Sequence, residues 1–336
     1  MSIFTSFQPS GSGSLQLGNL LGALMPFKNM ASKISNKDIF LSVASLHSTT
    51  QQFSPNDLKK SRIEMLASFH ACGLYDIPNI SIFDQCDNNH ITEISQLISH
   101  IASLGPLEVM TQFKDKGRSN SRDEVPFGLL SYPILMTADI LSLQSSIIPV
   151  GIDQHQHLQF AKSLIKRINK RFGCEFILPN SYIHNSPKIM DLKFIDKKMS
   201  KSRPEGAIFL DDSLDVVSKK IKKATTDNDL IPSTVSELET RPACKNLITM
   251  YSSIRNISLQ ESCDIFSGKG YGVLKGSIIE SYEEIITPIS NKLADSRKFI
   301  IEQPLDVIFP NFDKVLSISE SVKNKLKDSM GLGSIK

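Results

Sequence analysis

Two lysines and two serines lie close together in the run 198–202 (KMSKS). Lys198 and Lys201 each carry an ammonium group on a flexible stem, which can follow a phosphate whose charge grows during a reaction. The hydroxyl groups of Ser200 and Ser202 can donate hydrogen bonds to the same phosphate oxygens. A lysine-rich run of this length is also typical of a solvated basic loop. The run alone therefore leaves a phosphate site and a surface loop as alternatives.

A second element that suits phosphate lies in the stretch 8–19 (QPSGSGSLQLGN). A β-like run leads through a Gly/Ser loop into a helix start, where free backbone N–H groups and the helix dipole attract anions. Gly18 would let a nucleotide approach closely, and Asn19 offers a side-chain donor. A flexible linker is the alternative, but a linker between a strand and a helix would be unexpected. Because the GxxxxGK[ST] pattern of a P-loop is absent, we predict that this stretch and the run 198–202 form two halves of another kind of nucleotide site.

Two further places combine an acidic side chain with an apolar element. Asp139 is the only acidic residue in the helical pattern 132–141, and a buried carboxylate is costly unless it accepts hydrogen bonds. It is therefore either a ligand acceptor or a structural group. The strand pattern 146–150 ends at Gly151 and is followed by Asp153 and Gln154. In doubly wound sheets, ligands bind outside the carboxyl ends of the strands.

The elements that must position these groups alternate between strands and helices in the first part of the chain. Strands are predicted at 3–7, 38–44, 80–83 and 146–150, and helices at 18–30, 55–72, 90–104 and after residue 150. This alternation predicts an α/β fold, a Rossmann-like doubly wound parallel sheet. Beyond about residue 204 only helices are predicted, at 213–224, 243–254, 258–266, 276–294 and 313–330. We expect a catalytic domain with a helical insertion at 1–190, a loop and joint at 191–206, and a smaller all-helical domain at 207–336, whose last helix can pack on the first domain.

The composition is that of an ordinary globular protein. Hydrophobic residues make up 40% and charged residues 22% of the 336 residues, and the longest apolar runs are too short to span a bilayer. Motif residues begin almost at Met1, which predicts a cytoplasmic protein without a leader. The five cysteines lack CxxC spacing, so we predict neither a disulfide framework nor a metal site. Two basic clusters suggest a polyanionic partner such as RNA: Lys162, Lys166, Arg167, Lys170 and Arg171, and Lys219, Lys220, Lys222 and Lys223.

Several of these segments resemble the class I aminoacyl-tRNA synthetases, and specifically their tryptophanyl branch. The run 198–202 matches the KMSKS signature letter for letter, and 16–19 (QLGN) stands where the family has its HIGH-type tetrapeptide. The stretch 110–116 (MTQFKDK) matches one particular to tryptophanyl enzymes, and 149–154 (PVGIDQ) resembles the family's PVGEDQ. The segment 220–227 resembles part of the helical domain. The resemblance extends over roughly residues 3 to 290, in order.

The resemblance implies a tryptophan–tRNA ligase. Such an enzyme activates tryptophan with ATP and Mg²⁺ to tryptophanyl-adenylate, releases pyrophosphate, and transfers the acyl group to tRNA(Trp); the family also implies a homodimer. The implied catalytic residues are Asn19, Lys198 and Lys201. The implied ATP contacts are Gln8, Pro9, Ser10, Gly18, Asn19, Gly151, Ile152, Asp153, Ile189, Lys198, Met199, Ser200, Lys201 and Ser202. The implied tryptophan contacts are Asp139, as acceptor of the indole N–H, with Tyr132, Met136, His47, Gln154, Ile148 and Val150.

Two other functions stay open at this point. A tyrosyl-type enzyme has a similar Tyr…Asp helix but tends to carry Gln where this chain has Met136. A non-catalytic tRNA-binding paralogue would keep the fold without the activity. The chain also departs from the family pattern. The Gly11–Ser14 loop is two residues longer than usual. Ser45 takes the place of Asp in the segment Val-Ala-Asp-Leu-His that is common in the family, and Ile152 stands where Glu is common.

Overall fold

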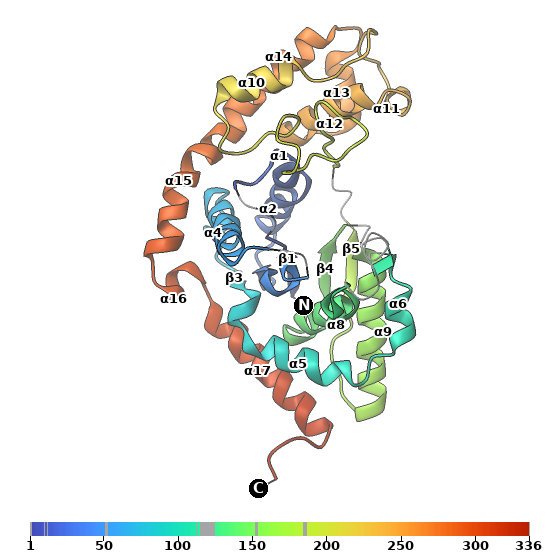
Figure 1. The fold of residues 1–336 in the computed structure, drawn as a ribbon, viewed down its shortest axis with the longest axis vertical. Coiled ribbons are helices and arrows are strands. Elements are labelled where there is room, and N and C mark those ends of the chain that lie inside the picture. The colour runs from blue at the N-terminus through green and yellow to red at the C-terminus, as the bar shows by residue number, and fades with distance from the viewer. Residues whose placement is uncertain are drawn as a thin grey trace.

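A five-stranded parallel sheet forms the centre of the molecule (Figure 1). The computed structural model describes residues 2–9, 11, 13–50, 53–111, 113–114, 125–151, 154–183 and 187–335. The strands are β1 (Ile3–Phe7), β2 (Ile39–Val43), β3 (Ile80–Asp84), β4 (Ile147–Val150) and β5 (Asn180–Ile183), in the spatial order β3-β2-β1-β4-β5. The doubly wound parallel α/β fold is thus confirmed. The sequence prediction missed β5, whose short sequence NSYI lacks the apolar run of the other four strands.

The register brings the carboxyl ends of three strands to one edge of the sheet. Phe7 pairs with Val43, and Val43 pairs with Asp84. The chain therefore leaves β1, β2 and β3 at the same level. Turn residues directly after these strands must meet at that edge, as expected for a ligand site in a sheet of this kind.

Successive side chains of the strands enter two different hydrophobic cores, because they point to opposite faces of the sheet. Ile3 and Leu41 belong to one core, which also contains buried residues of α2 (Met25–Ala31) and α4 (Pro55–Ala71). Phe4 and Phe40 belong to the other, with α5 (Asn89–Ser99), α8 (Phe127–Ser142) and α9 (His155–Phe172). Helices thus cover both faces of the sheet.

Of the helices after residue 210, all but the last extend the first core, and the buried residues Val315, Val322 and Leu326 of the last belong to the second. These helices are α10 (Leu214–Lys222), α11 (Val235–Leu238), α12 (Pro242–Arg255), α13 (Leu259–Phe266), α14 (Tyr271–Ser281), α15 (Thr287–Glu302), α16 (Leu305–Ile308) and α17 (Phe312–Ser329). Buried residues of α10 and α12 to α15 form one cluster with those of α2 and α4. In Figure 1, α15 runs beside α4, and α17 then passes along β3 and α5.

Three predicted helices differ in detail from the structure. The predicted helix 90–104 ends at Ser99 in the structure. A new helix, α6 (Leu104–Glu108), begins at Leu104, because Pro106 is tolerated only in the first turn of a helix. A π-helical turn, η1 (Leu20–Leu24), joins α1 (Leu17–Asn19) to α2. A second, η5 (Tyr282–Ile286), joins α14 to α15 just before Pro288, which cannot donate a backbone hydrogen bond.

Short helices follow the ends of two strands: α3 (Ser45–Ser48) after β2, and the 3-10 turn η2 (Gln85–Asp87) after β3. Among the described residues, no helix has the length and apolarity that a bilayer crossing requires.

Candidate active site

The lysine run 198–202 lies against the Gly/Ser loop. The ammonium group of Lys201 donates a hydrogen bond to the carbonyl oxygen of Gly13 at 2.8 Å. Gly11 and Gly13 have φ angles of 59° and 90°, a backbone region that side chains other than glycine rarely adopt. The two elements that the sequence pairs therefore meet in space, and the glycines allow the loop to turn beneath the lysine.

Gly18 is the point where the lysine run docks on the helix start. A Cβ atom on Gly18 would lie 3.4 Å from Met199 Cβ and 3.6 Å from Ile189 Cβ, so a larger residue would be tightly confined. The N–H of Met199 donates to the carbonyl of Ile189 at 3.2 Å, and both side chains are buried. Ile189 and Met199 thus pack against the residue that the sequence assigned to nucleotide approach.

The structure brings together two of the three candidate catalytic residues. Asn19 and Lys201 line one small cavity, together with Glu64 of α4. Lys198 is exposed, and its carbonyl oxygen accepts a hydrogen bond from Arg203 at 2.7 Å. The hydroxyl groups of Ser200 and Ser202 lie 2.9 Å apart on the solvent side of the run.

The position of Lys201 gives its charge an unusual environment. Burial lowers the pKa of Lys201 below its ordinary value of 10.5, and the nearby carboxylate of Glu64 opposes that shift. The charged form is the one that stabilises phosphate oxygens, so the activity it supports is lost as pH rises through the lowered pKa. We expect the profile of kcat/KM for ATP, which reports the free enzyme, to fall at a pH below 10.5, the ordinary pKa of a lysine. In Lys201→Arg this fall should move to higher pH; an unmoved profile would assign it to another group.

Asp191, a residue that the sequence analysis did not single out, anchors the lysine run. Its buried carboxylate accepts hydrogen bonds from the backbone N–H groups of Lys193 and Phe194, both at 2.9 Å, and faces Arg203 at 3.4 Å. A Cβ atom on Gly206 would overlap this carboxylate. The joint at 203–206 therefore keeps the run in place through one buried charge.

We expect Gly206→Ala to destabilise the protein. The added methyl group must displace Asp191 from its N–H partners, and a buried charge that loses its partners costs on the order of 3 kcal/mol. Urea unfolding should show this loss in the free energy of unfolding. Gly276→Ala is the control, because a Cβ atom there meets nothing within 4 Å. Equal stability of the two variants would contradict the anchoring role of Asp191.

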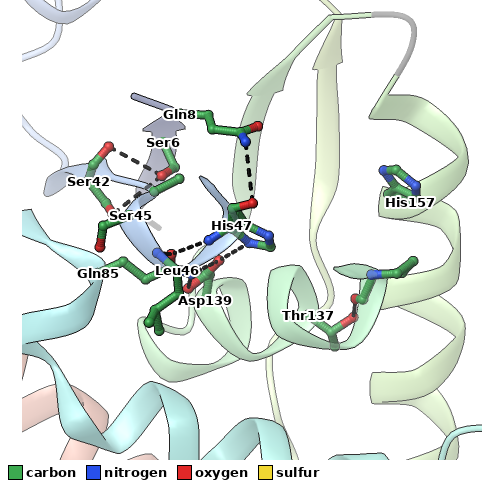
Figure 2. Close-up of polar contacts among 12 residues, drawn as sticks. Ser6, Gln8, Ser42, Ser45, Leu46, His47, Gln85, Thr137, Asp139 and His157 are labelled. Carbon is green, nitrogen blue, oxygen red and sulfur yellow. Dashed lines mark hydrogen bonds and ion pairs between the residues drawn. The ribbon is translucent and has the colours of Figure 1, made fainter. Parts of the chain in front are cut away.

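All seven residues assigned to the amino acid line one cavity of about 210 Å³. They are His47, Tyr132, Met136, Asp139, Ile148, Val150 and Gln154. They come from the turn after β2, from α8, and from β4 with the start of α9. Figure 2 shows two members of this group, His47 and Asp139, pointing toward each other.

Asp139 is buried, and its hydrogen-bonding capacity is largely used. Its Oδ2 atom lies 3.0 Å from Nε2 of His47. The side-chain amide of Gln85 donates to both carboxylate oxygens, at 2.8 and 2.9 Å. The ring of Tyr132 covers His47 with a centroid distance of 4.0 Å. The sequence analysis missed Gln85: its place directly after β3 marks it as a residue of the ligand-binding edge, but its contact with Asp139 appears only in the folded chain.

One buried polar atom in this group has no protein partner. Nδ1 of His47 makes no hydrogen bond to any described residue, although the side chain is only 3% exposed. Buried polar atoms are usually paired. A polar ligand in the neighbouring cavity would supply the missing partner.

A second cavity, of about 310 Å³, adjoins the first. The two share six lining residues: Thr5, Ser6, Gln8, Pro149, Val150 and Gln154. The second cavity also reaches Asn19 and Gly151. A carboxylate in the first cavity could therefore meet a phosphate that extends from the helix start at Asn19.

The remaining candidate residues are placed as follows. Pro9 is buried, and its carbonyl oxygen accepts a hydrogen bond from the hydroxyl of Ser48 at 2.8 Å. Ser10, Ile152 and Asp153 lie outside the described residues.

Comparison with known proteins agrees with this arrangement. A family model described as tRNA synthetases class I (W and Y) matches residues 1–281. The tryptophan–tRNA ligase of Bacillus anthracis is 35% identical over 335 residues, which covers 98% of each chain.

Solved structures give the same result. The tryptophanyl-tRNA synthetase of Mycoplasma pneumoniae superposes with a TM-score of 0.83 at 32% identity, over 99% of this chain and 98% of that one. The Campylobacter jejuni enzyme, solved in complex with ADP and tryptophan, gives a TM-score of 0.77 at 26% identity, over 99% of this chain and 100% of that one. The chain therefore belongs to the class I tRNA synthetases (W and Y), within the family of the tryptophan–tRNA ligases.

Proposed function

We propose that this protein is a tryptophan–tRNA ligase with its amino-acid site at Asp139. The observation that carries the proposal is the cavity around Asp139, which all seven predicted amino-acid contacts line, next to the cavity that reaches Asn19. The solved relative from Campylobacter jejuni holds ADP and tryptophan, the two kinds of ligand that these neighbouring cavities would take.

The first step requires no protein nucleophile. A carboxylate oxygen of tryptophan attacks the α-phosphorus of ATP, the bond from that phosphorus to the bridging oxygen breaks, and pyrophosphate leaves with the electron pair. In the second step a hydroxyl of the terminal ribose of tRNA(Trp) attacks the carbonyl carbon, the bond from that carbon to the phosphate oxygen breaks, AMP leaves with the electron pair, and the hydroxyl proton is released. Catalysis then rests on positioning and on charge stabilisation.

The lysines and Asn19 are assigned to the phosphates. Lys201, now bonded to the carbonyl oxygen of Gly13, would exchange that neutral acceptor for a charged phosphate oxygen. The exposed Lys198 would join it when the run closes on the nucleotide. Ser10, Gly18, Gly151, Ile152, Asp153 and Ile189 remain proposed ATP contacts by their place in the motifs.

Asp139 is assigned to the indole N–H, and the apolar walls to the indole ring. Met136, Ile148 and Val150 line the same cavity, so the ring would lie against them. A site that must pair a buried acceptor rejects a side chain without the matching donor by roughly 10⁴-fold. Phenylalanine lacks such a donor, and Met136 stands where tyrosyl-type enzymes tend to carry Gln, which favours the tryptophan assignment over the tyrosyl alternative.

Magnesium is proposed to enter with ATP. Among the described residues, the one cluster of three potential metal ligands is Asp84, Cys86 and Asp87. The guanidinium of Arg62 already lies against all three of them. This cluster is therefore a poor site for a cation. Mg²⁺ in nucleotide enzymes is bound largely by phosphate oxygens and water, and we propose that it is held in this way here. The proposal also includes a homodimer that acts in the cytoplasm.

The test is ATP-dependent transfer of radiolabelled tryptophan to tRNA. We expect tRNA(Trp) to be charged only when ATP and Mg²⁺ are both present, and a tRNA for another amino acid to stay uncharged. The absence of charging by an enzyme that still forms the adenylate would limit the function to the first step. The absence of both reactions would favour the non-catalytic paralogue.

A further inference from the structure

Gln85 bridges the backbone of α3 and the carboxylate of Asp139. Its Oε1 atom accepts hydrogen bonds from the N–H groups of Leu46 at 3.0 Å and His47 at 3.4 Å. Because Oε1 faces these two donors, the amide nitrogen must face Asp139, to which it donates twice. The side chain is 1% exposed, so water does not compete for these bonds. Its orientation is therefore set by the protein on both sides (Figure 2).

A buried carboxylate paired with a partly exposed arginine fixes the turn that carries Gln85. The carboxylate of Asp84, which is fully buried, accepts from Arg62 Nε at 2.6 Å, from the N–H of Cys86 at 3.2 Å and from the hydroxyl of Ser45. The family commonly has Asp at the position of Ser45. Here the carboxylate comes from the neighbouring strand β3, and the Ser45 hydroxyl reaches it. The turns after β2 and β3 are thus tied together directly behind Gln85.

The contacts of Gln85 determine which part of Asp139 remains open. A carboxylate offers about four lone-pair sites, two on each oxygen. With His47 donating from Nε2, Oδ2 accepts two hydrogen bonds and Oδ1 accepts one among the described contacts. Counted over these three contacts, Oδ1 has one more site to offer. An indole ring has a single N–H to offer.

We propose that Gln85 is a positioning residue for amino-acid specificity. It orients Asp139 and occupies its lone pairs so that one acceptor site remains for one N–H of the substrate. The inference rests on the proposed function, because it takes tryptophan to be the occupant of the cavity. Gln85 acts through Asp139 and not on the reacting atoms.

The near-isosteric variant Gln85→Glu tests this role through pH. The introduced carboxyl can still accept from Leu46 and His47, but it bonds Asp139 only while protonated, since two carboxylates in contact must share a proton. The other titratable groups near this pair are His47, Tyr132 beside it, and the Asp84–Arg62 pair with Cys86 behind. All of them are present in the wild type as well, so the comparison isolates the new group.

We expect KM for tryptophan in Gln85→Glu to rise at least tenfold between pH 6 and pH 9 relative to wild type, with kcat within about threefold. Gln85→Met, which removes the donor altogether, should raise KM about tenfold at every pH without the added slope. Gln96→Glu is the control, because Gln96 is exposed on α5 and bonds only His100 among the described residues.

Three outcomes separate the possibilities. A wild-type KM for tryptophan in both Gln85 variants would overturn the inference. A second result would also overturn the inference: variants with lower thermal stability and fewer active sites by titration, whose remaining active sites keep a wild-type KM for tryptophan. That result would assign Gln85 a purely structural role. A wild-type enzyme that does not activate tryptophan would instead overturn the proposed function.

Discussion

Lys201→Ala is expected to slow pyrophosphate exchange by about 10²- to 10³-fold, the usual cost of removing one preorganised group that stabilises developing charge. Lys201 already lies over the Gly/Ser loop, 2.8 Å from the carbonyl of Gly13 and beside Asn19. The loss should appear in kcat, because the charge that Lys201 stabilises grows mainly in the transition state. The affinity for tryptophan, measured at equilibrium, should stay within about threefold of wild type, since Lys201 is not among the residues that line that cavity.

Lys197→Ala is the matched control for this measurement. Lys197 directly precedes the run 198–202, but its side chain is 61% exposed and faces Asp196. Its loss should change exchange by less than about twofold, because exposed ion pairs contribute little. Equal effects of the two substitutions would show that the run acts through its overall charge, which would contradict the specific role of Lys201.

Asp139→Asn is expected to lower kcat/KM for tryptophan by about 10³-fold. The new amide keeps one acceptor oxygen, but its NH₂ group must face a donor: either the amide of Gln85, which now bonds both carboxylate oxygens, or the indole N–H itself. Both arrangements leave a buried polar group unpaired. Exchange kinetics with tryptophan, tyrosine and phenylalanine measure the loss and the remaining selectivity.

The KM for ATP separates a local effect from misfolding in this variant. Asp139 does not line the cavity that reaches Asn19, so KM for ATP should stay within about threefold of wild type. Unchanged activation of tryptophan by Asp139→Asn would contradict the role assigned to this carboxylate.

The strands and helices that follow from the local pattern of apolar residues could be predicted from the sequence. Apolar runs such as 39–43 predict strands because the residues of a parallel strand between two helical layers are buried on both faces, as all five are here. The run 147–150 predicts a strand by the same pattern, although only Ile148 is fully buried. The helix pattern at 158–168 is equally clear. The strand at 180–183 was missed because it is short and partly polar. The π-helical turns were missed because helix periodicity shows nearly the same pattern with and without them.

The site residues divide in the same way. His47, Tyr132, Asp139 and Gln154 were named from motifs and do line one cavity. Gln85 and Asp191 were not named, because their importance comes from partners distant in the chain. Gln85 contacts Asp139 across 54 positions of the chain. The Asp191 carboxylate fits in its place only because Gly206 has no Cβ atom. Contacts of this kind become visible only when the chain is folded.

The most direct test of the central claim is ATP–pyrophosphate exchange by the wild-type protein with tryptophan, tyrosine and phenylalanine, each supplied alone. The structure predicts exchange with tryptophan, and values of kcat/KM at least about 10³-fold lower with the other two. Phenylalanine offers Asp139 no donor, and tyrosine would place its hydroxyl in a cavity where Met136 stands in place of the Gln that tyrosyl-type enzymes tend to carry. Preferred exchange with tyrosine, or exchange with none of the three, would contradict the account.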